Sequence, residues 1–213
     1  MIEVSTVRLR PSARLVVAFG GIRQKLGPAS LEFYRSLEQV DCAALFVSDS
    51  ERRWYQYPAD IIDSLMDQVR AAAQEAGASR LVFIGNSMGG FAALHFGARM
   101  GADAILGFGA QTAILPEVTR ELGDMRWSKH QALIPSYPFG DLAREAPPKG
   151  RTVLCWAKDQ PLDRAHAQRL ARVWPLEHLI VPGGDHAAAA HLRDAGELGP
   201  LLRQAIAGEG RFS

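Results

Sequence analysis

One serine lies in a sequence context that could make it a nucleophile. Residues 81–90 read LVFIGNSMGG, in which Gly85, Ser87 and Gly89 fit the pattern G-x-S-x-G between an apolar run and a helical pattern. Such a turn pushes the serine hydroxyl out of the end of a sheet, and the positions two before and two after it come so close that only very small side chains fit. The N-terminus of the following helix also points free N–H groups at a developing negative charge. The pattern predicts that Ser87 attacks a carbonyl carbon; a Gly-rich turn without chemistry would leave the second glycine unexplained.

In this context the chain resembles the α/β-hydrolase superfamily, from about Arg14 to the C-terminus. That family orders its catalytic residues serine, acid, histidine. After the apolar run 152–157, the residues KDQPL resemble the family's acid loop G-x-x-D-x-x-V/L, with Trp156 where the glycine usually stands. The resemblance therefore assigns Asp159 as the acid. Asp163 is the alternative, although its position where the next helix should begin favours a helix N-cap.

The family's histidine follows the last strand of the sheet. Residues 181–186 read VPGGDH, which matches the family ending G-G-x-H and assigns His186 as the general base. Asp159 and His186 are far enough apart for one helix, one strand and two turns. Such a unit places neighbouring strand ends together, so that a carboxylate can orient an imidazole.

An oxyanion hole needs two backbone N–H donors. One should come from Met88, directly after the nucleophile. The family typically has His-Gly-x at the end of its first catalytic strand, where this chain has Phe19-Gly20-Gly21-Ile22. The resemblance implies Gly21 as the second donor, with Ile22 as the near alternative, because glycine lets the backbone approach closely. A simple tight turn is the other interpretation.

Two further segments should lie at the same end of the sheet as these residues. Residues 49–55 read DSERRWY, and Trp54 either lines a substrate pocket or is tucked onto the body of the protein. The stretch 112–150 contains five prolines and breaks the regular alternation of elements. It predicts a long connection of loops and short helices, in which Trp127 could roof a substrate pocket as part of a small lid. Ile22 is a third candidate for substrate contact.

Short β-rich runs alternate with longer helical patterns, which is typical of a parallel sheet covered by helices. Residues 59–76 form the clearest amphipathic helix. The first nine residues predict an antiparallel edge strand. The expected strands are 14–19, 43–47, 80–84, 104–108, 152–157 and 177–181, and the expected helices are 29–39, 59–76, 88–100, 163–173 and 197–207.

Composition excludes several classes of protein. The formal net charge of +1 gives no reason to expect a nucleic-acid partner. No close metal-ligand spacing occurs, and Cys42 and Cys155 both lie in apolar runs that predict buried, reduced thiols. The N-terminus lacks the apolar core of a secretory signal, and no apolar run approaches the ~20 residues of a membrane helix. We therefore expect a cytoplasmic protein that neither spans a membrane nor binds a metal.

The resemblance implies a single α/β-hydrolase domain over residues 1–213, with a mostly parallel sheet, helices on both faces and a minimal lid in 112–150. It implies a serine hydrolase, a carboxylesterase or thioesterase, that acts on a small-molecule acyl substrate and needs no cofactor. Two alternatives stay open. An acyltransferase could use the same triad, and a non-catalytic binding or assembly protein could retain the fold. The sequence does not indicate the oligomeric state.

Overall fold

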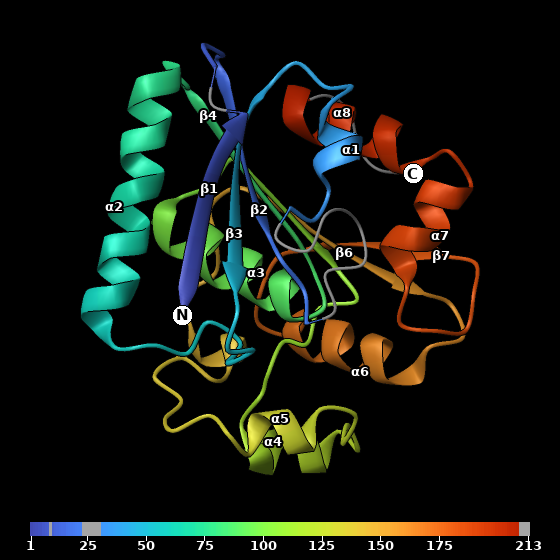
Figure 1. Ribbon diagram of the computed structural model, residues 1–213. Coiled ribbons are helices and arrows are strands. Elements are labelled where there is room, and N and C mark those ends of the chain that lie inside the picture. Colours follow the sequence, from blue (N-terminus) through green and yellow to red (C-terminus); the bar gives the residue numbers. More distant parts are fainter. Residues whose placement is uncertain (9, 23–30, 209–213) are drawn as a thin grey trace.

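A single twisted sheet forms the centre of the computed structural model, which describes residues 1–8, 10–22 and 31–208 (Figure 1). The sheet has seven strands in the order β1-β3-β2-β4-β5-β6-β7. Strand β1 pairs antiparallel with β3, and the other neighbours are parallel. The strands are β1 (Ile2–Arg8), β2 (Arg14–Phe19), β3 (Ala43–Asp49), β4 (Arg80–Asn86), β5 (Ala104–Phe108), β6 (Arg151–Ala157) and β7 (Glu177–Val181). The predicted mostly parallel α/β sheet is confirmed, and its first strand is the expected antiparallel edge; Leu9 lies outside the described residues.

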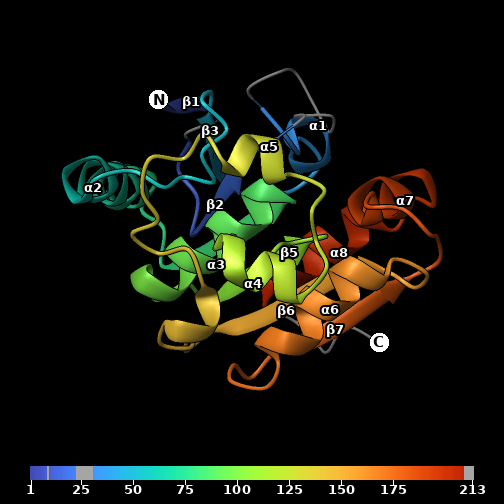
Figure 2. The ribbon, with the colours of Figure 1, turned by 90° about the horizontal axis from the view of Figure 1, so that it is seen from below.

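Helices cover both faces of the sheet, as Figure 2 shows from below. Helices α2, α3 and α6 pack on one face, and α1, α7 and α8 pack on the other. Within β2 the apolar residues alternate between the two layers: Leu15 and Val17 point to the first and Val16 to the second. Both faces are therefore buried, which explains why this strand reads as a continuous apolar run. The helices are α1 (Tyr34–Leu37), α2 (Ala59–Ala76), α3 (Met88–Met100), α4 (Pro116–Glu121), α5 (Ser128–Gln131), α6 (Pro161–Leu170), α7 (Ala188–Asp194) and α8 (Leu198–Ala207), with a short 3₁₀ helix η1 (Leu142–Arg144).

Two predicted helices differ from the observed ones. The pattern over 29–39 predicts a longer helix than α1, and residues 29 and 30 lie outside the described part of the chain. The helix predicted over 163–173 begins earlier, at Pro161, because the Gln160 side chain accepts the Leu162 N–H and caps it. No helix in residues 1–8, 10–22 and 31–208 is long and apolar enough to span a membrane.

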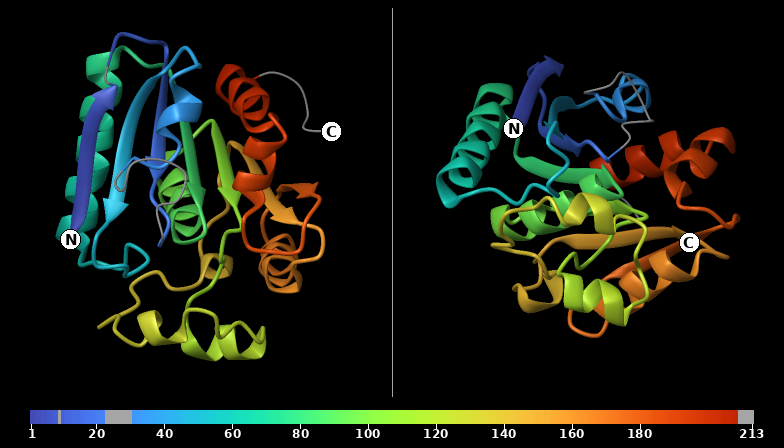
Figure 3. Two further views of the ribbon diagram at one scale, coloured as in Figure 1. Left: turned by 45° about the vertical axis from the view of Figure 1, so that its right-hand side comes forward. Right: turned by 60° about the horizontal axis from the view of Figure 1, so that its bottom comes forward.

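The stretch 112–150, called the connection below, joins β5 to β6 beneath the carboxyl ends of the strands (Figure 3). It contains α4, α5 and η1, as its irregular sequence predicts. Polar contacts tie it to α6. The Asp141 carboxylate receives two hydrogen bonds from Arg169, at 2.7 and 2.8 Å. The connection is thus anchored to the helix that follows β6.

Candidate active site

Ser87 lies between the end of β4 and the start of α3 in a strained backbone conformation. Its φ of 54° and ψ of −116° place it where non-glycine residues pay about 1–3 kcal/mol. A Cβ on Gly85 would overlap the carbonyl of Gly89, and a Cβ on Gly89 would overlap the carbonyl of Phe19. Both glycines are therefore required by the tight strand-to-helix turn, which is the physical reason for the G-x-S-x-G spacing.

A chain of hydrogen bonds joins Ser87, His186 and an aspartate. Ser87 Oγ lies 2.7 Å from Nε2 of His186. The opposite ring nitrogen, Nδ1, lies 2.8 Å from each carboxylate oxygen of Asp163. Ser87 and Asp163 are buried, and the His186 side chain is 19% exposed. In this arrangement the imidazole can accept the serine proton while the carboxylate fixes its tautomer.

The structure corrects the assignment of the acid. Asp159 is exposed in the turn after β6, and among the described residues its carboxylate makes no hydrogen bond to His186. Because α6 begins at Pro161, Asp163 lies inside the first turn of the helix, where its side chain points into the protein. Asp163 is therefore not the helix N-cap either, since that position belongs to Gln160. The assignments of Asp159 as the acid and of Asp163 as the N-cap were both wrong for the same reason, because the helix starts two residues earlier than expected.

Sequence reasoning missed a guanidinium beside this aspartate. Nη1 of Arg126, in the connection, lies 2.8 Å from Oδ1 of Asp163 and 3.2 Å from Nδ1 of His186. Two further nitrogens of Arg126 bind the carboxylate of Asp124, at 2.9 and 2.7 Å. Burial raises the pKa of Asp124, but hydrogen bonds from Arg126 and His166 outweigh it and hold that pKa far below its usual range. No local sequence signal links Arg126 to Asp163, because they are distant in sequence.

Of the two backbone N–H groups expected to form the oxyanion hole, that of Met88 is suitably placed and that of Gly21 is already bonded. Met88 is the first residue of α3, where a backbone N–H has no carbonyl of its own helix to bind. The Gly21 N–H, in contrast, donates to Oε2 of Glu32, a buried carboxylate. The prediction that Gly21 offers a free donor is therefore wrong for this arrangement. Ile22 is buried beside it and is the remaining candidate for the second donor.

Glu32 has an unusual environment for a carboxylate. Burial raises its pKa to about 7, against the opposing effects of the Gly21 N–H and the Asn86 side chain. Its second oxygen, Oε1, has no hydrogen-bond partner among the described residues. Asn86 directly precedes Ser87, so Glu32 lies close to the nucleophile turn. The sequence placed Glu32 only within an expected helix and gave no sign of its burial.

Glu32 should make the protein less stable as the pH rises. Its folded-state pKa is raised from 4.5, so the native state binds the proton more tightly than the unfolded state does. The contribution of Glu32 to the free energy of unfolding is fully present below about pH 4.5. It is lost as the pH rises through about 7, which lowers the free energy of unfolding by about 3 kcal/mol in total. Glu32→Gln keeps an acceptor for Gly21 and removes the charge. Urea unfolding at several pH values should show that the variant lacks this loss.

The exposed Glu38 of the same segment provides the matched control. Glu38→Gln should retain the pH dependence of the wild-type protein. If Glu32→Gln and the wild-type protein lose the same unfolding free energy between pH 5 and pH 8, Glu32 does not carry a raised pKa.

The aromatic residues proposed to contact substrate form a short series that ends at His186. The Trp127 ring lies 6.5 Å from that of Trp54 and 6.4 Å from that of His186, measured between ring centroids. Trp54 is fully buried, and its Nε1 donates to Oε1 of Gln111 at 2.9 Å. Trp54 therefore packs beside Trp127 inside the protein, which favours the interpretation that Trp54 is tucked onto the body of the protein. Trp127 is half-buried and can present surface beside His186.

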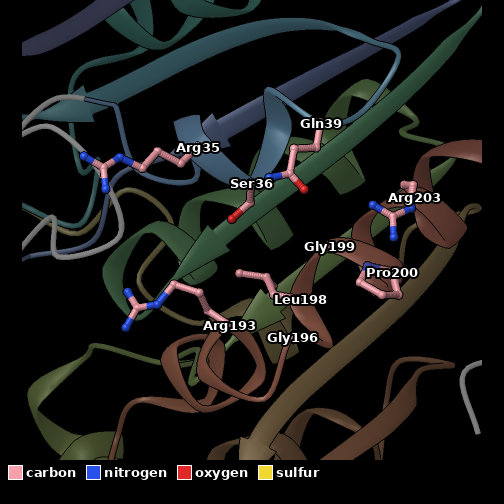
Figure 4. Close-up of a pocket in the computed structure, with 9 residues that line it drawn as sticks. All are labelled: Arg35, Ser36, Gln39, Arg193, Gly196, Leu198, Gly199, Pro200 and Arg203. Atoms are coloured by element: carbon pink, nitrogen blue, oxygen red, sulfur yellow. The ribbon is translucent and has the colours of Figure 1, made fainter.

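A separate hollow of about 300 Å³ lies between α1, α7 and α8. Arg35, Arg193 and Arg203 line it, and Figure 4 shows their guanidinium groups spread around it without converging. Neither Ser87 nor His186 contributes to this hollow. Elsewhere, Cys42 and Cys155 are buried and form no disulfide, as predicted. The residues that the structure describes include no group of three or more His, Cys, Asp or Glu side chains suited to a metal ion.

No protein-family model matches the sequence, and no curated protein matches it in sequence. Solved structures match it in fold. The capsule O-acetyltransferase of Neisseria meningitidis serogroup A has a TM-score of 0.66 and 14% identity, over 92% of this chain and 89% of its own. Mouse alpha/beta hydrolase domain-containing protein 10 has a TM-score of 0.63 and 12% identity, over 97% and 93% of the two chains. An α/β-hydrolase enzyme from a metagenome of Moroccan lagoon sediments has a TM-score of 0.55 and 16% identity, over 95% and 92%. The chain therefore has the α/β-hydrolase fold.

Proposed function

We propose that this chain is a serine hydrolase that cleaves an ester or thioester of a small molecule through an acyl-enzyme on Ser87. The observation that carries the proposal is the continuous hydrogen-bond chain from Ser87 through His186 to Asp163. A buried carboxylate, an imidazole and a serine on a strained turn are the parts that nucleophilic acyl transfer requires. The α/β-hydrolase fold gives the proposal further support, although fold alone does not establish an activity.

In the proposed reaction, Ser87 Oγ attacks the carbonyl carbon and its proton passes to Nε2 of His186. The N–H of Met88 donates to the resulting oxyanion, together with a second donor near Ile22. His186 then gives the proton to the departing alcohol or thiol, which leaves an ester on Ser87. Water attacks this ester with His186 as base, and the carboxylic acid leaves as Ser87 recovers its proton.

Acyl transfer to another hydroxyl is the second candidate. It is favoured by the fold similarity to a capsule O-acetyltransferase, the structure with a TM-score of 0.66. Such an enzyme would form the same ester on Ser87, and a hydroxyl group of a second substrate would replace water in the last step. The half-buried Trp127 could present an apolar face to a sugar ring at that point.

One experiment distinguishes these candidates. Short and long p-nitrophenyl esters and acyl-CoA thioesters are incubated with the protein, with and without an oligosaccharide. A hydrolase releases free acid at a rate that the oligosaccharide does not change. A transferase places the acyl group on the oligosaccharide and turns over faster in its presence. If neither activity occurs and a fluorophosphonate labels no serine, the fold serves a non-catalytic binding role and the proposal is wrong.

Trp127→Ala should change which acyl chains are preferred, mainly through KM, because the ring lies beside His186, 6.4 Å away between ring centroids. The effect should be up to about tenfold in KM, the amount expected for removal of one apolar contact surface. The full ester panel and the melting temperature check this prediction. A uniform loss of rate on all substrates that follows a lower melting temperature would instead mean that Trp127 only braces the connection.

A further inference from the structure

The buried carboxylate of Asp163 is paired with the guanidinium of Arg126 as well as with His186. Within the described residues its hydrogen-bond donors are Nδ1 of His186 and Nη1 of Arg126. The side chain of Asp163 is 1% exposed, so water contributes little to its solvation. A buried carboxylate without compensation takes up a proton instead of remaining charged. Arg126 therefore supplies the positive charge that lies against this buried carboxylate, at 2.8 Å from Oδ1.

Arg126 is itself fixed by the connection. Asp124 binds it through both carboxylate oxygens, and the two residues are separated by only one position. Asp124 is held in turn by Nε2 of His166, at 3.1 Å. Nδ1 of His166 accepts the backbone N–H of Thr112, so the proton of this ring is on Nε2 and the ring is neutral. The guanidinium is thus held in one orientation from the side opposite Asp163.

We infer that Arg126 is a positioning residue that acts through Asp163 and sets the pH at which the His186–Asp163 pair takes up its proton. This inference rests on the proposed function for its effect on catalysis. The series of contacts Asp124–Arg126–Asp163 also makes the connection part of the active site. The residue whose positive charge lies against Asp163 comes from the connection and not from the sheet or its flanking helices.

The direction of the effect follows from counting charges. With Asp124, Arg126 and Asp163 ionised, the net charge beside His186 is one negative. Removal of Arg126 leaves two negative charges, so the pair binds its proton more tightly, whichever partner carries it. The pH midpoint of kcat/KM should then move upward. Removal of the Asp124 charge leaves none, and the midpoint should move downward.

Other charged and titratable groups near His186 keep their partners in the Arg126 variants, and only His166 loses one in Asp124→Asn, namely the Asp124 carboxylate. They are His166 in α6, Asp159 in the turn before it, and Asp185 and His191 beside the turn that carries His186, with Asp185 and His191 paired at 2.7 Å. A shift of the midpoint in opposite directions can therefore be assigned to Arg126 and Asp124.

The test compares Arg126→Gln, Arg126→Lys and Asp124→Asn with the control Arg169→Gln. Arg169 makes a similar ion pair between α6 and the connection, with Asp141, and contacts none of Ser87, His186 or Asp163. Both the pH profile of kcat/KM and the pH titration of the His186 imidazole resonance by NMR are measured. The NMR titration needs no turnover, so it tests the inference even if the proposed function fails.

Arg126→Gln should raise both midpoints by about 1 pH unit, which lowers kcat/KM about tenfold on the acidic side. Arg126→Lys should keep both midpoints close to those of the wild-type protein, because the positive charge remains. Asp124→Asn should move the midpoints the other way, and Arg169→Gln should lower the melting temperature alone. Unchanged midpoints in both Arg126→Gln and Asp124→Asn would overturn the inference. If the variants show the NMR shifts but the wild-type protein has no Ser87-dependent turnover, the proposed function is wrong and the inference about Arg126 stands.

Discussion

Ser87→Ala should lower kcat by on the order of 10⁴- to 10⁶-fold, as loss of a catalytic serine does in other enzymes of this mechanism. The physical reason is that His186 Nε2, 2.7 Å from Ser87 Oγ, would have no hydroxyl to deprotonate. Steady-state rates on the best ester or thioester of the panel measure the effect. Circular dichroism and thermal unfolding should show that the variant remains folded, because alanine replaces serine without added volume.

Ser79 provides the matched control for this variant. It is exposed just before the opposite end of β4, away from the nucleophile turn. Ser79→Ala should retain the rate of the wild-type protein. Comparable turnover in carefully purified Ser87→Ala protein would show that another group is the nucleophile.

Asp163→Asn should lower kcat by roughly 10⁴-fold, the loss expected when the residue that orients a catalytic histidine loses its charge and can hold the ring in the wrong tautomer. An asparagine is nearly the same size as the aspartate, so the packing around the first turn of α6 is preserved. The amide would leave Nδ1 of His186 without a carboxylate at 2.8 Å, and the ring could adopt the wrong tautomer. Rates at several pH values measure the effect.

Asp159→Asn is the paired variant, and we expect it to change kcat less than about twofold because its carboxylate is exposed and makes no hydrogen bond to His186 among the described residues. The two substitutions are chemically identical and fall on the same short segment. A large loss in Asp159→Asn together with a small one in Asp163→Asn would mean that the acid assignment from the sequence was correct and the observed contact is not used.

The sequence predicts those features that are determined locally. The nucleophile turn is one of them, because the space around Gly85 and Gly89 is decided by the crossing of β4, α3 and the end of β2. The histidine is another, since it lies in the loop that follows the last strand. The amphipathic pattern over 59–76 likewise predicts α2 with the same boundaries.

The remaining features depend on contacts between distant segments or on a small difference in where a helix begins. Pro161 is well suited to the first helical position, and this preference could have moved the expected start of α6 and placed Asp163 inside it. No comparable signal exists for Arg126, which reaches Asp163 only because the connection folds back onto α6. The same holds for Glu32, whose contact with Gly21 occupies an N–H that the sequence suggested was free.

Trapping of the acyl-enzyme tests the central claim most directly. The protein is mixed with excess p-nitrophenyl acetate, quenched in acid within the first turnover, and digested for peptide mapping by mass spectrometry. The account predicts a burst of p-nitrophenol close to one equivalent per chain and a single acetyl group on the peptide that contains Ser87, both absent in Ser87→Ala. An acetyl group on a different residue, or turnover without any acetylated peptide, would contradict it.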